Sequence, residues 1–599
     1  MHPTPIPARL AALRAAMQQH RLAAYIVPSS DPHLSEYLPA RWQGRQWLSG
    51  FNGSVGTLIV TADQAGLWVD SRYWTQAEAE LAGSGIALMK IPAVSSTLHI
   101  DWLAEQVPAG GRVGADGAVL GLAQARLLEQ QLGPRGVSLD TSIDLLEQVW
   151  PEREALPTAP IYAHPARFAP TSRAAKLAQV RAEMNRLGAQ WHFISTLDDL
   201  AWLFNLRGAD VNYNPVFVGH ALIGPDRAEL FVAPGKIDAT LAAQLAADGV
   251  AVRPYPAAAA ALAALPGDAT LLLDPRRITL GFRQAVAAGV KVVEAVNPST
   301  FAKSRKTAEE ADFIRRAMEQ DGAALCEFFC WLEAAIERGE RITELTIDEQ
   351  ITAARARRPD FVSPSFSTIA GFRGNGAMPH YRATEESHAV IEGDGLLLID
   401  SGAQYYGGTT DITRMVAVGQ LNDEQRRDCS LVLKGVIALS SLHFPRSVRS
   451  PMLDAIARAP IWAAGIDYGH GTGHGVGYFL NVHEGPQVIG PSAMPEPHTA
   501  MEQGMITSVE PGIYRPGQWG VRIENLVLNV PHEQTRFGDF LAFETLTLCP
   551  IDTRCLDLAL LRPDEIAWLN HYHAEVRRRL SPLVQGEALA WLERRTAAV

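Results

Sequence analysis

The chain is poor in cysteine. Five cysteines occur among 599 residues, an odd number, and no Cys-x-x-Cys pair is present. Cys326 and Cys330 stand four residues apart on one face of an expected helix. A metal or redox pair is one interpretation of them, but two small buried hydrophobic residues are the more ordinary one. This cysteine usage fits a reducing compartment, and we expect the cytoplasm.

Long apolar runs and long basic runs are also missing. No uninterrupted apolar stretch is long enough to span a bilayer. The segment MHPTPIPARLAALRAAMQQHRL has no long apolar core and no clear cleavage site, so it predicts a short tail and an amphipathic helix rather than a signal peptide. The formal net charge is −12, with no basic run to offset it. We therefore expect neither a membrane nor nucleic acid as a partner.

The order of patterns along the chain indicates an α/β protein of several domains. A chain of 599 residues is too long for one core. Two segments, about 165 residues apart, repeat one plan of helix, strand and apolar hairpin, the hairpins being GTLIVTADQAGLWVD and HALIGPDRAELFVAPG. We place three domains at residues 1–156, 157–303 and 304–599. The third opens on a long amphipathic helix, where Lys306 and Glu309 are expected to be solvated charges.

The last third of the chain holds a set of side chains that is hard to explain without metal. Four are carboxylates and one is an imidazole, each in a glycine-rich or strand-like context: Asp400, Asp411, His474, Glu510 and Glu524. Four carboxylates gathered in an apolar interior would repel one another and lose hydration. Two divalent cations remove that cost. The set therefore predicts a dinuclear metallohydrolase.

The two aspartates flank a predicted two-stranded ribbon. Asp400 ends the apolar run GLLLID, and Asp411 begins the strand DITRMVAV. Gly407 and Gly408 between them mark a turn. The simplest geometry presents both carboxylates to one side. For either aspartate alone, a turn cap or a solvent-facing position would be the more ordinary interpretation.

The remaining members follow in the same order along the chain. His474 lies in HGTGHGVGYFLNVHEGP, which also contains His470 and His483, and three histidines so close together favour a site. Glu510 follows the apolar strand MITSV. Glu524 is expected in mid-strand, where alternation puts Arg522 on the same face as a partner for a metal-bound carboxylate. A surface pair of Arg522 and Glu524 is the alternative.

The chemistry of the set suits hard or borderline ions. Carboxylate oxygens with one imidazole favour ions such as manganese, and no cysteine is involved that would select zinc. Two such ions roughly 3.5–4 Å apart can hold a bridging hydroxide and polarise a carbonyl. We therefore expect two divalent metal ions, with Mn²⁺ as the leading candidate, and hydrolysis of an amide.

These motifs resemble the pita-bread metallopeptidases, and most closely the three-domain, cytosolic type of Xaa-Pro aminopeptidase. The segments that carry the resemblance run along nearly the whole chain: YIVPSSDPHLSEY, SGFNGSVGT, WVDSRYW, DDLAWLFNLRGADVNYNPVF, DSGAQYYGGTTDITR, HGTGHGVGYFLNVHEGP and RIENLVL. The resemblance implies an α/β (α+β) fold in which two tandem creatinase-like domains precede a pita-bread catalytic domain. It also implies a homodimer.

The resemblance assigns a role to each member of the metal set. Asp400 and Asp411 would bind one ion, with Asp411 bridging to the second. His474 would complete the second site beside Glu510, and Glu524 would bridge. Glu510 would also take the proton from the attacking water, a role that a carboxylate near a metal-bound water can perform.

The resemblance also implies a set of substrate-binding residues. His380 in GNGAMPHYR would bind the substrate, and His483 in NVHEGP would contact it near the scissile bond. Either of the two could stabilise the developing oxyanion. His470 would line the pocket for the substrate proline, and Phe366 would give that pocket an apolar wall. Arg72 in VDSRYW would reach a peptide substrate, across a dimer.

The implied reaction is removal of the N-terminal residue from peptides with proline at the second position. The bond before proline has no N–H on its nitrogen, so a dedicated pocket is plausible. A prolidase-like Xaa-Pro dipeptidase with the same metal centre is the main alternative. A non-catalytic peptide-binding or histone-binding module would lose metal ligands, and none is lost here. A creatinase-like hydrolase would not need five ligands.

Overall fold

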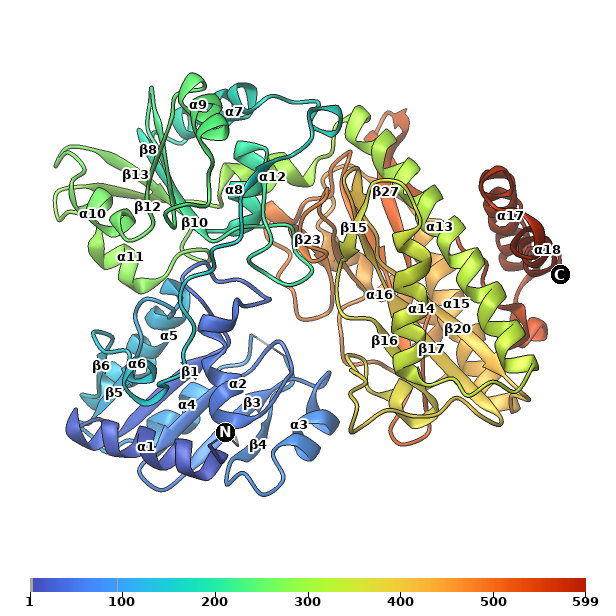
Figure 1. Cartoon of the computed structure of the whole chain (residues 1–599), viewed down its shortest axis with the longest axis horizontal. Helices are drawn as coiled ribbons and strands as arrows, with labels where there is room; N and C mark the ends of the chain where they lie inside the picture. Colours follow the sequence, from blue (N-terminus) through green and yellow to red (C-terminus); the bar gives the residue numbers. More distant parts are fainter. Residues whose placement is uncertain (1–3, 94) are drawn as a thin grey trace. The chain divides into compact units, whose positions relative to one another are not determined.

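A computed structural model describes residues 4–93 and 95–599 of the chain (Figure 1). Its internal contacts divide it into two compact units. The first unit holds the residues up to His164 together with Thr171–Thr300. The second holds Pro165–Pro170 and Phe301–Val599. Apart from residues 165–170 and 301–303, both predicted N-terminal domains therefore fall into the first unit, and all of the predicted metal ligands fall into the second.

The first half of the first unit is a mixed sheet with helices packed around it. The strands, in spatial order, are β4 (Ala87–Lys90), β3 (Ala65–Val69), β2 (Thr57–Thr61), β1 (Ala24–Pro28), β5 (Arg112–Ala115) and β6 (Ser138–Asp140). The helices are α1 (Ile6–Gln19), α2 (Gly44–Ser49), α3 (Trp74–Glu80), α4 (Leu98–Gln106), α5 (Leu122–Leu132) and α6 (Leu145–Val149).

The second half of this unit repeats the same plan. Its strands, in spatial order, are β12 (Val250–Pro254), β11 (Ala228–Val232), β10 (Gly219–Ile223), β8 (Trp191–Ile194), β13 (Thr270–Leu273) and β14 (Lys291–Glu294). Its helices are α7 (Arg173–Arg186), α8 (Leu197–Phe204), α9 (Ala239–Ala247), α10 (Ala257–Ala263) and α11 (Leu280–Ala285). A small pair, β7 (Tyr162–Ala163) and β9 (Leu206–Arg207), adjoins it.

The two sheets agree strand by strand, in order and in direction. In each, a central strand pairs antiparallel with a hairpin on one side and parallel with a strand on the other: β1 with β2 and β5, and β8 with β10 and β13. Both predicted hairpins, β2–β3 and β10–β11, are present and antiparallel. The repeat read from the order of sequence patterns is therefore confirmed at the level of topology.

The two halves share apolar contacts, which explains why they form one unit. A single cluster of buried side chains includes Ile26 and Leu128 from the first half and Phe193 and Leu271 from the second. Backbone hydrogen bonds join the same surfaces, with the Leu280 N–H donating to the Leu120 carbonyl at 2.8 Å.

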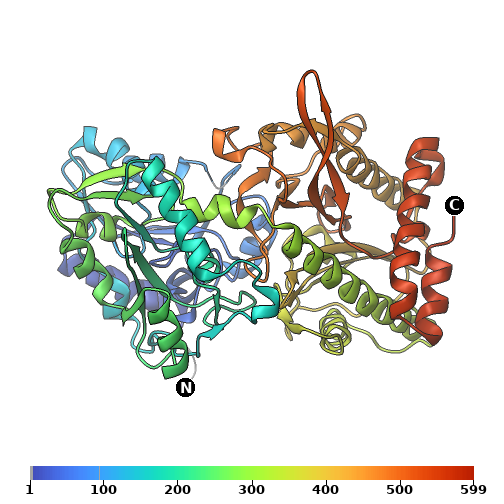
Figure 2. The same cartoon turned by 90° about the horizontal axis from the view of Figure 1, so that it is seen from above.

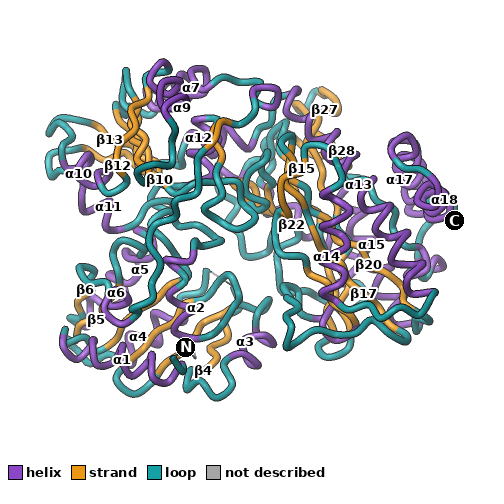
Figure 3. Tube along the Cα trace, in the orientation of Figure 1, coloured by secondary structure: helices purple, strands orange, loops and turns teal. Residues whose placement is uncertain are grey.

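The second unit contains long helices and several small sheets (Figure 3). Its helices are α13 (Ala308–Glu337), α14 (Glu344–Ala356), α15 (Asp423–Ser440), α16 (Asp454–Trp462), α17 (Pro563–Leu580) and α18 (Gly586–Arg595). Helix α12 (Pro298–Ser304) spans the division between the units. The second unit also has short 3₁₀ segments: η3 (Ala166–Phe168), η4 (Arg373–Ala377), η5 (Ser450–Leu453), η6 (Pro497–Thr499), η7 (Thr553–Cys555), η8 (Leu558–Leu560) and η9 (Ser581–Leu583). Two further 3₁₀ segments, η1 (Ala40–Trp42) and η2 (Gly133–Arg135), belong to the first unit.

The strands of this unit are mostly antiparallel neighbours. One sheet has β15 (Phe361–Pro364), β18 (Ala403–Tyr405) and β19 (Gly408–Thr409), and another has β16 (Ile369–Phe372), β17 (Gly395–Ser401) and β20 (Ile412–Val418). A larger one has β21 (His443–Pro445), β28 (Gly538–Thr545), β27 (Asn525–Thr535), β24 (Ile506–Val509), β22 (Gly473–Gly475) and β23 (Glu484–Ile489). A hairpin of β25 (Gly512–Arg515) and β26 (Trp519–Arg522) follows β24. Figure 2 shows the β27–β28 hairpin projecting from this unit.

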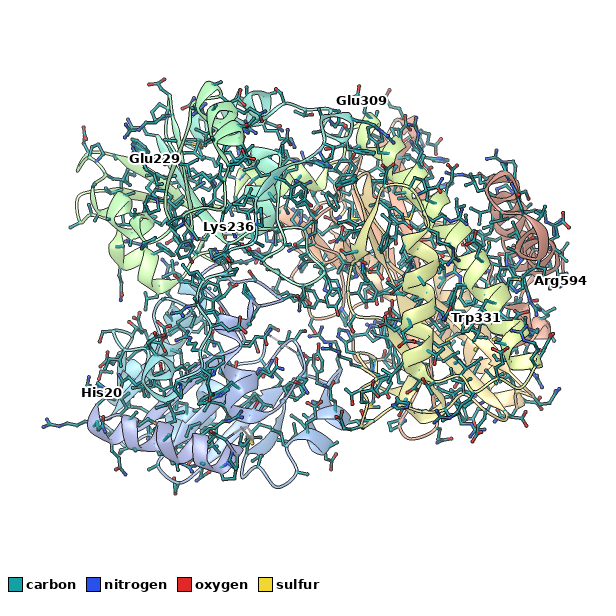
Figure 4. The ribbon with its side chains drawn as sticks, in the orientation of Figure 1. His20, Glu229, Lys236, Glu309, Trp331 and Arg594 are labelled. Atoms are coloured by element: carbon teal, nitrogen blue, oxygen red, sulfur yellow. The ribbon has the colours of Figure 1, made fainter. Side chains whose placement is uncertain are left out.

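The long helix α13 forms where the sequence predicts it. The Thr307 side chain accepts from the Glu310 N–H, and the Glu310 carboxylate accepts from the Thr307 N–H, which is a capping box. Glu309 in its first turn is exposed, and Trp331 in its second half packs against the core of the unit (Figure 4). Cys326 on the same helix is buried, whereas Cys330 is only half-buried.

The prediction for Lys306 is wrong. Its side chain is fully buried and forms an ion pair with Glu484, because the chain just before α13 lies against the strand that carries this carboxylate. Across residues 4–93 and 95–599, no helix has both the length and the apolar character needed to cross a membrane.

Candidate metal centre

The two aspartates lie on neighbouring strands, as the predicted ribbon requires. Strand β17 pairs antiparallel with β20, and Asp400 stands opposite Thr413. Asp411 is the residue immediately before β20, two positions from Thr413, and alternation along a strand puts both of these side chains on the same face. The intervening chain forms the β18–β19 hairpin, which turns at Tyr406 and Gly407. The predicted geometry is therefore present, with Asp411 just outside the strand.

His474, Glu510 and Glu524 converge on this face. His474 lies in the larger sheet, Glu510 follows its strand β24, and Glu524 precedes its strand β27. His474 lies in β22, and its Nε2 is 3.5 Å from Asp411 Oδ2 and 3.3 Å from Glu510 Oε1. One ligand atom each from Asp411, His474 and Glu524 lie within 4.8 Å of one another. Side chains from separate strands thus form one cluster, of a size that a metal ion could occupy.

Glu524 reaches the cluster in a way that the sequence analysis did not predict. The residue is not in mid-strand, because β26 ends at Arg522 and β27 begins at Asn525. Its N–H donates to the Thr413 carbonyl at 3.2 Å, and Thr413 Oγ1 donates to Glu524 Oε2 at 2.7 Å. The break between the strands turns Glu524 inward, and Thr413 on the facing strand holds it there.

The tautomer of His474 is set by the backbone of its own strand. Its Nδ1 lies 3.0 Å from the carbonyl oxygen of Gly475, which can only accept, so Nδ1 carries a proton. In the neutral ring, the lone pair of Nε2 then faces the carboxylates of Asp411 and Glu510. A lone pair directed at two carboxylates is unfavourable unless a cation lies between them, and this donor set fits a metal ion.

The charges of the cluster indicate the same chemistry. Burial, and next the charges of Asp400 and Glu510, raise the pKa of Asp411 well above its usual range. Burial, and next the charge of Asp411, raise the pKa of Glu524, and burial raises the pKa of Glu510 to about 7. Within the part of the chain that the structure describes, the buried Oδ1 of Asp400 accepts no hydrogen bond. Divalent cations would relieve these costs together, so the residues fit a metal pair.

A chain of hydrogen bonds runs away from Asp400. Arg522 Nη2 donates to Asp400 Oδ2 at 2.6 Å, and Arg522 Nη1 donates to the Tyr514 hydroxyl at 2.8 Å. That hydroxyl lies 2.8 Å from His470 Nε2. Arg522 and His470 were predicted from the sequence, whereas Tyr514, which connects them, was not. Its only sequence signal is its position in the EPGIY segment after Glu510.

Ser508 is a second residue that the sequence analysis missed. Its Oγ accepts from the His474 N–H at 3.0 Å and lies 3.2 Å from Glu510 Oε1. The Glu510 N–H in turn donates to the Thr472 carbonyl at 2.8 Å. One hydroxyl therefore links the backbone of His474 to the carboxylate of Glu510, and strand alternation two residues before Glu510 is the signal that could have found it.

The predicted substrate-binding residues lie in two different units. His483 is close to the cluster, with its ring centroid 4.3 Å from that of His474. Phe366 is buried, and its ring is so close to Gly402 that a Cβ there would lie 2.9 Å from it. His380 is half-buried in the segment between β16 and β17. Arg72 belongs to the first unit, where it makes a two-pronged ion pair with Asp70 at 2.8 Å.

Comparison with known proteins identifies the class of fold and site. Residues 312–530 match the model of metallopeptidase family M24, and residues 539–599 match the C-terminal region of peptidase M24. Residues 9–149 and 152–310 each match a model of the creatinase/prolidase N-terminal domain. The expected fold class, with creatinase-like domains ahead of a pita-bread domain, is thereby confirmed.

Relatives that match along the full length indicate the kind of M24 metallopeptidase to which the chain is similar. The chain is 37% identical over 615 residues to the protein named Probable Xaa-Pro aminopeptidase P of Coprinopsis cinerea, covering 99% of this chain and 98% of that one. It is 35% identical to Xaa-Pro aminopeptidase 1 of Dictyostelium discoideum, covering 97% and 95%. The crystal structure of X-prolyl aminopeptidase from Caenorhabditis elegans, described as a cytosolic enzyme with a di-nuclear active site, matches with a TM-score of 0.94 at 30% identity, covering 100% of both chains.

The chain therefore belongs to the aminopeptidase P family of M24 metallopeptidases. It is a metal-dependent aminopeptidase, and the alternative of a prolidase-like dipeptidase is disfavoured because the full-length relatives are aminopeptidases.

Proposed function

We propose that the protein releases the N-terminal residue from peptides with proline at the second position, and that five side chains hold a pair of divalent cations for this reaction. The proposed ligands are Asp400, Asp411, His474, Glu510 and Glu524. The observation that carries the proposal is the convergence of Asp411, His474 and Glu524 within 4.8 Å, in an interior where their charges need compensation. When bound, the cations supply Lewis acidity and lower the pKa of water.

The side chains around the cluster would divide the remaining work. Glu510 is the proposed general base, because its carboxylate faces the cluster, 3.3 Å from His474 Nε2, where it would lie within reach of a metal-bound water. His483 and His380 would donate hydrogen bonds to the carbonyl oxygen as it gains charge. Arg522 would orient Asp400 through their 2.6 Å contact.

We further assign substrate recognition to three side chains. His470 and Phe366 would line the pocket for the proline ring. Arg72 would reach the peptide substrate across a dimer. A proline-specific site is physically reasonable because the imide nitrogen offers no N–H and the ring fixes the backbone angle, so a general aminopeptidase site that binds that N–H recognises it poorly.

The finer assignments of metal, compartment and assembly are also proposals. Oxygen-rich ligation with one imidazole favours Mn²⁺ as the ion. A cytoplasmic location is supported by the relative from Caenorhabditis elegans, which is described as cytosolic. A homodimer is expected from the family resemblance, and light scattering of the purified protein would test it. The proposed domain limits remain 1–156, 157–303 and 304–599.

Hydrolysis of two matched peptides tests the proposed activity. The protein is stripped with a chelator, reloaded with Mn²⁺, Zn²⁺ or Mg²⁺, and incubated with Arg-Pro-Pro and with Arg-Pro. We expect release of arginine from the tripeptide, highest with Mn²⁺ and lost on chelation. Cleavage of the dipeptide alone would instead identify a prolidase-like dipeptidase. No cleavage of either peptide under any metal would contradict the proposal.

A further inference from the structure

Glu344 is a buried carboxylate outside the metal cluster. It is the first residue of α14 and is 1% exposed. A carboxylate so far from water is costly unless donors surround it. Here four groups donate to it: Phe372 N–H at 2.7 Å, Asn375 Nδ2 at 3.0 Å, the Tyr381 hydroxyl at 2.8 Å and Ala389 N–H at 2.7 Å.

All four donors come from one stretch of chain. Phe372 ends β16, and the others lie in the segment that connects β16 to β17. That segment contains His380, and Tyr381 is its immediate neighbour. Tyr381 is itself 6% exposed, and its hydroxyl also lies 2.5 Å from the Ser387 carbonyl. One carboxylate therefore fixes both the beginning and the end of the turn that presents His380.

The other side of the segment is fixed by close backbone packing. A Cβ placed on Gly520 would lie 1.8 Å from the Gly376 carbonyl oxygen, and one placed on Gly371 would lie 2.7 Å from Gly376. The η4 turn can therefore pack directly on β26, the strand that ends at Arg522. Arg522 in turn contacts Asp400, so the segment is bonded to Glu344 and packs against the strand whose last residue contacts the metal cluster.

We propose that Glu344 is a positioning residue that holds His380 in place for the reaction. The inference rests on the proposed function, because it takes His380 as a group that contacts the substrate. Without the carboxylate, the donors of Asn375 and Tyr381 lose their common acceptor, and the turn around His380 is free to shift. A displacement of about 1 Å at a reacting group can cost on the order of 100-fold in rate.

The variant Glu344→Gln tests the proposal with little change in size. The amide keeps one acceptor oxygen but replaces the other with a donor, which would face donors of the segment. We expect kcat/KM for Arg-Pro-Pro to fall by about 10- to 100-fold, with metal content unchanged. Glu349→Gln is the matched control, since Glu349 is exposed on the same helix, and it should leave kcat/KM within about twofold.

A double-mutant cycle with His380→Ala separates positioning from general loss of stability. If Glu344 acts through His380, Glu344→Gln should add less than about twofold to the loss already caused by His380→Ala. If the double variant instead loses activity by the product of the two single-variant factors, the two residues act independently and the inference is overturned. A Glu344→Gln variant as active as the wild type would also overturn it, while leaving the proposed function intact.

The remaining outcomes are also decisive. If Glu344→Gln does not fold, Tyr381→Phe removes one donor and takes its place in the cycle, with the same non-additivity expected and additivity contradicting it. If His380→Ala has full activity, Glu344 has nothing to position and the inference fails. A wild-type protein that does not cleave Arg-Pro-Pro at all would overturn the proposed function, and the inference with it.

Discussion

Lys306 and Glu484 form a fully buried ion pair although they are 178 residues apart in the chain. The Lys306 ammonium also donates to the Val476 carbonyl at 2.7 Å, and the backbone N–H of Lys306 donates to the Gly504 carbonyl at 2.9 Å. Glu484 follows His483 and stands opposite Gly475, the neighbour of His474. The pair therefore connects the chain before α13 to β23, which begins just after His483 and pairs with β22, the strand that carries His474.

Removal of this ammonium should destabilise the protein. In Lys306→Met, the Glu484 carboxylate stays buried but loses its ion-pair partner, while the ammonium of Lys303 lies farther away, at 3.5 Å. Breaking a buried pair costs about 3–5 kcal/mol, and we expect a fall of about 6–12 °C in the melting temperature of the catalytic unit. Differential scanning calorimetry measures it. Arg305→Met is the control, since Arg305 is an exposed neighbouring cation, and an equal effect of both variants would refute the prediction.

Substitution of Arg522 should weaken metal binding without removing a ligand. Arg522→Lys keeps the charge but cannot reach Asp400, Thr413 and Tyr514 at once, as the guanidinium does. Loss of a group that orients a metal ligand typically costs about 10- to 100-fold in affinity. Titration of the metal-free protein with Mn²⁺ measures this. Arg536→Lys, on the exposed β27–β28 turn, should bind like the wild type, and an unchanged affinity in Arg522→Lys would show that the contact is dispensable.

Neutral isosteres of the metal-binding carboxylates should abolish turnover. In Asp411→Asn or Glu510→Gln the side chain keeps its shape, so circular dichroism should report a native fold while hydrolysis of Arg-Pro-Pro is lost. Near-normal activity of either purified variant would contradict the assigned roles.

The metal-free protein should become less stable as pH rises because of Glu510. Its folded pKa is raised to about 7 from an ordinary value of 4.5, so between these values the folded state holds a proton that the unfolded state has released. Stability therefore falls with rising pH across this window. Glu510→Gln has no such charge. The melting temperature of metal-free Glu510→Gln should exceed that of metal-free wild type by more at pH 8 than at pH 5.5, and a difference that is independent of pH would contradict this assignment.

Local pattern was sufficient to predict much of the fold and the cluster. The antiparallel placement of Asp400 and Asp411 follows from apolar strands around a glycine turn, and the repeat in the first unit follows from the order of helix, strand and hairpin. These features depend on neighbours in sequence, which periodicity reports directly.

Contacts between distant segments could not be read in the same way. Glu524 enters the cluster through a break between β26 and β27, where alternation predicted a continuous strand. Lys306 was expected to be a solvated charge, because its partner Glu484 is 178 residues away in the chain. Nothing in the local sequence pattern marked Glu344. Tyr514 joins Arg522 to His470 only because a hairpin brings them together. In each case, the tertiary partner decides the role of the residue.

The metal content of the purified protein tests the central claim most directly. The protein is reconstituted with Mn²⁺, desalted, and measured by elemental analysis beside the variant Asp411→Asn. We predict about two equivalents of metal per wild-type chain, since paired ions are what a cluster of this composition holds, and a clear loss in the variant. A wild-type protein that retains no metal after reconstitution, or a variant that binds as much as the wild type, would contradict the account.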